Sequence, residues 1–292
     1  MSRADSVVVV GGGTMGAGIA QSLIEAGAEV ILVESADDRV DAAYKRVEDG
    51  LKRRYKREGN PQVYVAEAIG RLTLRAGLPD GGSGPAPALV IEAVYEDADL
   101  KREILAGCEK AFPGTLLASN TSSLSIDGLA AGLADPTRFL GLHFFNPVPL
   151  SQLVEIVVGS ATTPEVVEEA QGWVERLAKT AIVVRDSPGF ATSRLGLAVG
   201  LEAIRMVEEG VASVQDIDRG MVLGYKYPIG PLELGDLVGL DVRLAIAEHL
   251  HSELGERFAP PKLLRDMVAR GEVGKKSGKG FYDWSSGEAR GK

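Results

Sequence analysis

Short apolar runs alternate with longer amphipathic segments over the first two thirds of the chain. The apolar runs, rich in Val, Ile and Leu, predict strands at 7–10, 29–33, 71–76, 88–94, 115–119, 139–143, 153–158 and 181–184. The segments between them have helical spacing at 17–26, 38–59, 99–110, 126–132 and 164–178, and a Gly- and Pro-rich surface loop is expected at 77–87. This alternation predicts an α/β fold with a doubly wound, Rossmann-like parallel sheet.

The pattern changes after Arg185, where the apolar positions recur only at helical intervals. Helices are expected at 190–209, 213–223, 231–238, 241–254 and 261–270, and several of them end at a glycine. We therefore expect a nucleotide-binding domain at 1–186, an all-α substrate and dimerisation domain at 187–284, and a disordered polar tail at 285–292. Apolar stretches such as 195–201 and 232–240 exceed what one small bundle needs, which predicts a homodimer through these helices.

Composition restricts the possible partners and location. The net charge is -9, which argues against broad binding to nucleic acid or to an anionic membrane. A single cysteine, Cys108, excludes an internal disulfide and a multi-cysteine metal site, and no metal is expected. No run approaches the length of a membrane-spanning helix, and only six residues precede the first strand, too few for a targeting segment. A cytoplasmic location is expected.

A glycine-rich run directly follows the first predicted strand and opens the next helix. In this GGGTMG run (11–16), Gly11 permits a tight turn, Gly13 lets the backbone approach a pyrophosphate, and Gly16 lets the helix pack on the strand. Amide groups at the helix start, including those of Thr14 and Met15, then face the phosphates. An acidic residue, Glu34, ends the second strand, where it can bind the adenosine ribose and repel a 2′-phosphate. NAD is the expected cofactor, although Arg39 lies close by in the sequence.

One of the three histidines stands at a strand end, where doubly wound folds bind ligands. His143 ends an apolar strand, and Glu155 follows twelve residues later within the next predicted strand. Neighbouring strands can bring this carboxylate to the imidazole and fix its tautomer, although a strand-end histidine is often only packed. His249 and His251 fall in a helix beside glutamates, which is typical of a solvated face.

Six segments together resemble the L-3-hydroxyacyl-CoA dehydrogenase family, of the 3-hydroxybutyryl-CoA type. They are the glycine run and the motifs SNTSS (119–123), HFFNP (143–147), DSPGF (186–190), PLEL (231–234) and GKKSG (274–278). The resemblance covers about 7–284. It implies NAD-dependent, reversible oxidation of a short-chain L-3-hydroxyacyl-CoA to the 3-ketoacyl-CoA, as part of fatty acid metabolism.

The resemblance also implies roles for individual residues. His143 matches the family's catalytic base, Glu155 its partner carboxylate, and Ser122 the serine near substrate and nicotinamide. The positions that match cofactor contacts are Glu96, Lys101, Asn120, Asn146 and Lys276. Two of these motifs also have a purely structural explanation. The residues of SNTSS are typical N-caps for the next helix, and the lysines of GKKSG are typical of a solvated turn.

Two features bear on the acyl-CoA substrate. Where the family usually has an asparagine, at the third position after the Phe of DSPGF, this chain has Ser193, whose hydroxyl is shorter than an amide. A basic helix at 45–57 can bind CoA phosphates, with Lys52, Arg53 and Lys56 as candidates and the two lysines preferred, or can be an ordinary solvated face.

Two other functions stay open. A dehydrogenase acting on a 3-hydroxy or sugar acid without CoA, of the L-gulonate type, shares the HFFNP-like segment. The 6-phosphogluconate and 3-hydroxyisobutyrate type is disfavoured, because its catalytic lysine has no counterpart in 190–205. The second open alternative is a non-catalytic NAD-binding structural protein.

Overall fold

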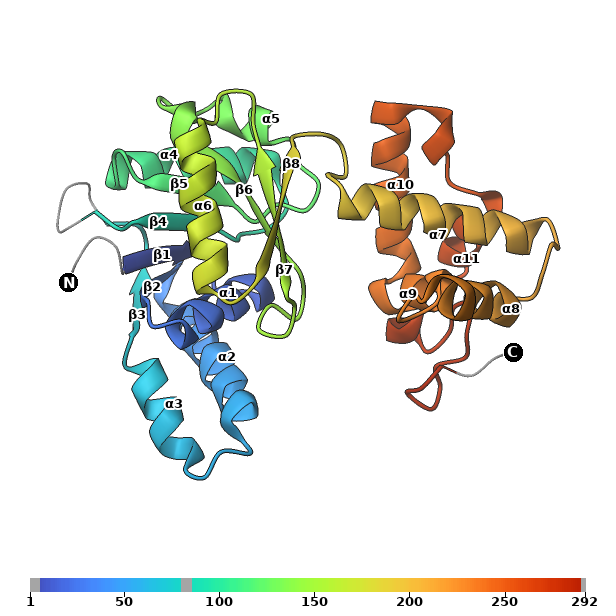
Figure 1. Cartoon of the computed structure of the whole chain (residues 1–292), viewed down its shortest axis with the longest axis horizontal. Helices are drawn as coiled ribbons and strands as arrows, with labels where there is room; N and C mark the ends of the chain where they lie inside the picture. The colour runs from blue at the N-terminus through green and yellow to red at the C-terminus, as the bar shows by residue number, and fades with distance from the viewer. Residues whose placement is uncertain (1–5, 80–85, 290–292) are drawn as a thin grey trace. The chain divides into compact units, whose positions relative to one another are not determined.

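A computed structural model describes residues 6–79 and 86–289. The chain divides into two compact units, Met1–Ser187 and Pro188–Lys292, and each is described by itself (Figure 1). Residues 80–85 of the expected loop at 77–87, and residues 290–292 of the expected disordered tail, lie outside the described residues. Residues 285–289 form turns and a bend.

The first unit is built on one sheet of eight strands in the order β3-β2-β1-β4-β5-β6-β7-β8. Each of the eight apolar runs forms a strand, as predicted. The strands are β1 (Ser6–Val10), β2 (Glu29–Glu34), β3 (Leu72–Ala76), β4 (Leu89–Glu92), β5 (Leu116–Ser119), β6 (Phe139–Phe144), β7 (Leu153–Val158) and β8 (Thr180–Arg185).

Helices cover both faces of this sheet (Figure 1). They are α1 (Thr14–Glu25), α2 (Asp37–Tyr55), α3 (Pro61–Ile69), α4 (Ala98–Ala111), α5 (Ile126–Ala130) and α6 (Pro164–Arg176). Residues of α1, α2 and α6 share one apolar core with alternate strand residues such as Val7 and Val9. Helix α4 packs against β4 and β5, and it carries the buried side chains of Leu105 and Cys108. Burial on both faces explains why central strands such as β1 and β4 are almost entirely apolar, whereas the edge strands β3 and β8 are partly exposed and include polar residues.

Two details differ from the sequence prediction. The helix expected at 38–59 ends at Tyr55, and α3, which the sequence analysis did not assign, begins at Pro61, where the missing N–H of proline costs no helical hydrogen bond. The sheet is also not wholly parallel, because β6 and β7 pair antiparallel. The connection at 145–152 is too short for the crossover of about a dozen residues that a parallel pair requires.

The strand order reverses between β1 and β4, and this point organises the candidate site. From β1 the chain proceeds to β2 and β3 on one side and to β4, β5 and β6 on the other. The carboxyl ends of β1 and β4 therefore diverge into connections on opposite faces, and a crevice opens between them. The glycine run follows β1 at this edge, and the segments after β4, β5 and β6 lie along the same edge.

The second unit is helical and has a core of its own. Its helices are α7 (Thr192–Glu208), α8 (Val214–Arg219), α9 (Pro231–Val238), α10 (Leu240–Leu254) and α11 (Lys262–Ala269). The helix expected at 213–223 is α8 followed by a π-helical turn, Gly220–Gly224. The buried carboxylate of Asp236 accepts hydrogen bonds from Phe281 N, Tyr282 N and Trp284 Nε1, which fastens the last segment to α9.

Within residues 6–79 and 86–289, none of the helices combines the length and the apolar character that crossing a membrane would require.

Candidate active site

The glycine run forms a tight turn that fits a dinucleotide. Gly11 has φ +98°, and a Cβ there would lie 2.8 Å from the carbonyl oxygen of Ala93. A Cβ on Gly16 would lie 1.7 Å from the carbonyl oxygen of Gly11, so only glycine lets α1 start this close to β1. Apart from Gly13 itself and its two neighbours in the chain, no described residue has a heavy atom within 4 Å of the Cβ position of Gly13, which borders the cleft. The first amides of α1 thus face open space suited to phosphate.

Glu34 and Arg46 hold the middle glycine of the run from its two sides. The Gly12 N–H donates to Glu34 Oε1 at 2.8 Å, and Arg46 Nη1 donates to the Gly12 carbonyl at 3.1 Å. A Cβ on Gly12 would lie 2.4 Å from Ala43 Cβ, so α2 packs directly on the turn. No individual role was predicted from the sequence for Gly12 or Arg46. The hydrogen bond from the Gly12 amide therefore fixes the position of the Glu34 carboxylate beside the glycine run.

A cleft of about 760 Å³ extends from this turn along the carboxyl ends of β1, β2 and β4. The predicted cofactor residues Gly11, Gly13, Thr14, Met15 and Glu34 line it. Arg39 and Arg46 also line it, so two guanidinium groups share the cleft with the carboxylates of Glu34 and Asp38. These residues fit a dinucleotide, because they provide helix-terminal amides for the pyrophosphate and a carboxylate for the ribose.

His143 and Glu155 face each other across the antiparallel strands β6 and β7. They are opposite partners in the strand register, and His143 Nδ1 lies 2.7 Å from Glu155 Oε2. His143 is 6% exposed and Glu155 is completely buried, while the Phe145 ring packs against the imidazole with centroids 4.4 Å apart. A buried carboxylate at this distance accepts the Nδ1 hydrogen, which leaves the lone pair of the neutral imidazole on Nε2. The structure thus brings the two residues together as their spacing suggested.

Glu96 organises the turn that carries the serine motif. Its Oε1 accepts hydrogen bonds from Thr121 Oγ1 at 2.6 Å and from the amides of Ser122 and Ser123 at 2.9 and 3.1 Å. The hydroxyl of Ser122 also donates to it, at 3.3 Å. Ser122, which matches the family's serine near substrate and nicotinamide, is therefore held by Glu96 in this structure.

The pKa of Glu96 reflects opposing influences. Burial is the largest single influence and raises this pKa, while the hydrogen bond from Thr121 and the positive charge of Lys101 lower it. Hydrogen bonds from Ser122 and Ser123 add to the lowering. The pKa of Glu96 therefore lies below its ordinary value, which keeps this carboxylate ionised as an acceptor for the turn.

The remaining candidates after β4, β5 and β6 differ in their exposure. Lys101 is 1% exposed, and its ammonium contacts Glu92 and Glu96 at 2.7 and 3.3 Å. Asn120 Oδ1 accepts from the Phe144 amide at 2.9 Å, which ties the serine motif to the residue after His143. Asn146 lines a second pocket, next to α1.

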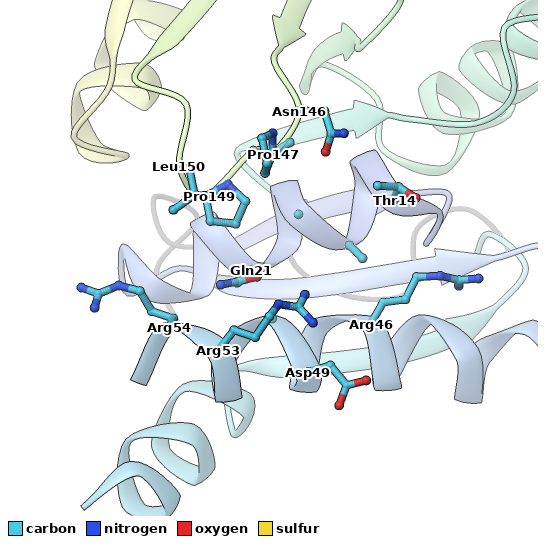
Figure 2. A pocket seen from close by; sticks show the side chains of 14 residues that line it. Thr14, Gln21, Arg46, Asp49, Arg53, Arg54, Asn146, Pro147, Pro149 and Leu150 are labelled. Carbon is cyan, nitrogen blue, oxygen red and sulfur yellow. The ribbon is translucent and has the colours of Figure 1, made fainter. Parts of the chain in front are cut away.

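This second pocket is a groove of about 580 Å³ between α1, α2 and residues 146–150 (Figure 2). Arg46, Arg53 and Arg54 line its α2 side, and Figure 2 shows Arg53 pointing toward Gln21 of α1. Lys179 Nζ donates to the carbonyls of Val148 and Ser151, which supports the opposite wall.

Of the three CoA candidates named from the sequence, Arg53 lines this groove, whereas the two lysines do not. Lys52 pairs with Glu48 at 2.7 Å, and Lys56 is exposed. Helical phase accounts for the difference, because 46, 50 and 53 share the face of α2 that packs on α1. Gly50 marks that face, since a Cβ there would lie 2.1 Å from Gln21 Oε1. The spacing of positions 46, 50 and 53 can be seen in the sequence, and it could have pointed to this face of the helix.

The second unit holds two further candidates. Ser193 is the second residue of α7 and is half-buried. Lys276 pairs with Asp241 at 2.6 Å and stands next to Gly239, at the boundary of α9 and α10. Asp241 has a pKa below its ordinary value, chiefly because of this hydrogen bond from Lys276.

In the parts of the chain that the structure describes, no group of three His, Cys, Asp or Glu side chains is arranged to hold a metal ion.

Profiles of known protein families match both units of the chain. The profile described as "3-hydroxyacyl-CoA dehydrogenase, NAD binding domain" matches residues 6–187, and "3-hydroxyacyl-CoA dehydrogenase, C-terminal domain" matches residues 189–284. The chain belongs to the 3-hydroxyacyl-CoA dehydrogenase family. It is an NAD-dependent oxidoreductase of this family that acts on a CH–OH group, and its first unit is the NAD-binding domain.

Individual relatives agree over nearly the whole length. The chain is 40% identical to the probable 3-hydroxybutyryl-CoA dehydrogenase of Bacillus subtilis, over 95% of this chain and 96% of that protein. It is 38% identical to the mitochondrial hydroxyacyl-coenzyme A dehydrogenase of Rattus norvegicus, over 95% and 90%. The crystal structure of (S)-3-hydroxybutyryl-CoA dehydrogenase from Ralstonia eutropha superposes with a TM-score of 0.90 at 39% identity, covering 96% and 98% of the two chains.

Replacing Glu34 tests its part in choosing the cofactor. Glu34→Gln keeps an acceptor for the Gly12 amide but removes the negative charge that repels a 2′-phosphate. We expect the ratio of kcat/KM for NADP to that for NAD to rise about tenfold, which corresponds to ~1.4 kcal/mol of lost repulsion. Glu29→Gln, at the opposite end of β2, is the matched control. An unchanged ratio in Glu34→Gln would remove this residue from cofactor discrimination.

Proposed function

We propose that this chain oxidises the 3-hydroxyl of a short-chain L-3-hydroxyacyl-CoA to the 3-ketoacyl-CoA, reversibly, with His143 as acid and base and Glu155 as its partner. The observation that carries the proposal is the 2.7 Å contact between His143 and Glu155 at the ligand-binding edge of an NAD-binding sheet. The names of the relatives in Bacillus subtilis and Ralstonia eutropha support a four-carbon acyl group.

In the proposed reaction the alcohol loses a proton and a hydride. The lone pair on His143 Nε2 accepts the hydroxyl proton, and the positive charge that forms on the imidazole is stabilised by the Glu155 carboxylate. NAD, held along the glycine run and Glu34, supplies the hydride acceptor for C3. In the reverse direction the imidazolium returns its proton to the oxygen of the ketone while C3 takes up a hydride, which the reduced cofactor would supply.

Ser122 is proposed to assist at the reacting oxygen. Its hydroxyl donates to Glu96 at 3.3 Å, a long hydrogen bond that a substrate oxygen can replace. The backbone of Ser122 stays attached to Glu96 through its amide at 2.9 Å, so its hydroxyl can rotate while the turn stays in place. Ser193 takes the place of the family's asparagine in this proposal, with a shorter reach toward the thioester.

We further propose that the arginine-lined groove binds the phosphates of CoA. Its guanidinium groups, on Arg46, Arg53 and Arg54, are rigid, planar donors that match phosphate oxygens. This local positive charge on a protein of net charge -9 favours an acyl-CoA over a free 3-hydroxy or sugar acid, which carries no phosphate. The buried catalytic pair argues against a purely structural role. Cytoplasmic location and fatty acid metabolism complete the proposal.

A homodimer through the second unit is the proposed assembly. Several large apolar side chains of that unit are exposed: Leu195, Leu223, Tyr225, Leu237, Val238 and Val242. Leu197, Leu201, Leu232 and Leu240, by contrast, are buried in the unit's own core. An exposed apolar set of this size is typical of an association surface.

The catalytic assignment predicts a selective loss in His143→Gln. The glutamine cannot take up a proton near neutral pH, so kcat for 3-hydroxybutyryl-CoA should fall by roughly 10²–10⁴, followed by NADH absorbance. The dissociation constant of NAD should change little, because no part of the glycine run is altered. Wild-type kcat in this variant would remove His143 from its role, and a wild-type enzyme without turnover would refute the proposed substrate.

The assignment of the groove predicts different effects for two neighbouring cations. Arg53→Ala should raise KM for acyl-CoA about tenfold through loss of one phosphate contact, with kcat and KM for NAD nearly unchanged. Lys52→Ala removes a cation of the same helix that pairs with Glu48, and its KM should stay within about twofold of wild type. If the larger effect came from Lys52→Ala, CoA would bind to the outer face of α2 instead.

The proposed assembly predicts a dimeric mass at micromolar concentration by light scattering. Leu223→Glu places a charge within the exposed apolar set of the second unit, so it should shift the mass toward that of a monomer. A monomeric mass for the unmodified protein would contradict the proposed dimer.

A further inference from the structure

Glu92 is a completely buried carboxylate at the point where the strand order reverses. It is the last residue of β4, in register with Val10 of β1 and Ser119 of β5. The Val94 amide donates to its Oε1 at 2.7 Å, and the Ser119 hydroxyl donates to its Oε2 at 2.6 Å. A carboxylate without solvent contact requires compensation of this kind, because burial strongly disfavours an isolated charge. The candidate roles described above do not involve Glu92.

The cation that compensates Glu92 is Lys101, which reaches it from the first turn of α4. The ammonium lies 2.7 Å from Glu92 Oε1, 3.3 Å from the Val94 carbonyl and 3.3 Å from Glu96 Oε2. An ammonium has three hydrogens, and these three oxygens account for all of them. With 1% of its surface exposed, Lys101 is directed into the protein and not into the cofactor cleft.

Glu96 connects Lys101 to the serine turn, residues 119–123. One of its oxygens, Oε2, faces Lys101, while the other, Oε1, accepts hydrogen bonds from Thr121, Ser122 and Ser123. The two oxygens belong to one rigid carboxylate, so a shift of Lys101 moves the acceptor that holds the turn. An unbroken series of contacts thus runs from Glu92 through Lys101 and Glu96 to Ser122.

We propose that Glu92 is a positioning residue for the dehydrogenase reaction, and that it sets the Ser122 turn through Lys101 and Glu96. Its charge divides the attraction of the Lys101 ammonium between two carboxylates. Without that charge the ammonium has only Glu96 as an anionic partner, and it draws Glu96 away from the turn. Lys101 is then a positioning residue as well, and it does not contact the cofactor directly. This inference rests on the proposed function, because it uses Ser122 at the reacting oxygen.

The test compares Glu92→Gln, Lys101→Met and the double variant in the full-length protein, with 3-hydroxybutyryl-CoA and NAD. Glutamine preserves shape and an acceptor oxygen, so the change is largely one of charge. We expect kcat of Glu92→Gln to fall about tenfold, while the dissociation constant of NADH stays within about threefold, since the glycine run and Glu34 are untouched. In the Lys101→Met background the same substitution should lower kcat by less than about threefold, because the ammonium that displaces Glu96 is gone.

Glu103→Gln, an exposed change on the same helix as Lys101, controls for the loss of one charge and should leave kcat unchanged. A merely structural role for Glu92 would lower the unfolding temperature but leave kcat of the folded enzyme near that of wild type. That result, or an equal loss of kcat in both Lys101 backgrounds, would overturn the proposal.

If Glu92→Gln does not fold, Ser119→Ala decides the question. It retains all charges, but it removes the donor to Glu92 Oε2 together with an acceptor of the Thr121 amide at 3.3 Å. It should therefore lower kcat about threefold in the wild-type background and by less in the Lys101→Met background, whereas loss of the Thr121 contact alone would act equally in both. Wild-type kcat in this variant would overturn the proposal. Failure of the proposed function itself has a different signature, since the wild-type enzyme would then not turn over the acyl-CoA.

Discussion

The hydrogen bond between His143 and Glu155 is the contact on which the proposed chemistry depends. Strand register produces it, because the two residues are direct partners on adjacent antiparallel strands, where opposite side chains on one face approach closely. Glu155 has no exposed surface, so its carboxylate is stable only with strong partners such as this imidazole. The same bond fixes the tautomer that makes Nε2 the base. One contact between two side chains therefore stabilises the buried carboxylate and prepares the imidazole for its proposed role.

Two carboxylates at this edge of the sheet organise the backbone that surrounds the cofactor cleft. Glu34 holds the glycine run through the Gly12 amide, and Glu96 holds the serine turn through several donors. In each case an acidic side chain orders a segment rich in small residues, which would otherwise have considerable conformational freedom. Glu92 lies between them at the reversal of strand order, and its proposed role extends this principle to a buried ion pair.

Local pattern was sufficient to predict the strands and the glycine turn, because each depends on residues close in sequence or on a regular spacing. The spacing of His143 and Glu155 allowed their pairing but also allowed a histidine that is only packed, and the register of β6 and β7 decides between the two. The connection at 145–152 is too short for a parallel crossover, so the sequence contained the information that β7 runs antiparallel to β6, but a parallel sheet was predicted. Helix α3 was missed because it is short, and its sequence signals, Pro61 at the start and buried Val65 and Ala68 three residues apart, are weak. Glu92 could not be found this way, because a glutamate ending an apolar strand is common, and its partners lie 9 and 27 residues away.

The central claim is that Glu155 acts on the reaction only through His143, and kcat of Glu155→Gln measured in two backgrounds tests it most directly. In the otherwise wild-type enzyme, the loss of the carboxylate should lower kcat substantially, because the protonated imidazole loses its stabilising charge. In the His143→Gln background the same substitution should have almost no further effect, since residues that act as a unit are not additive. An equal loss of kcat in both backgrounds would contradict the account.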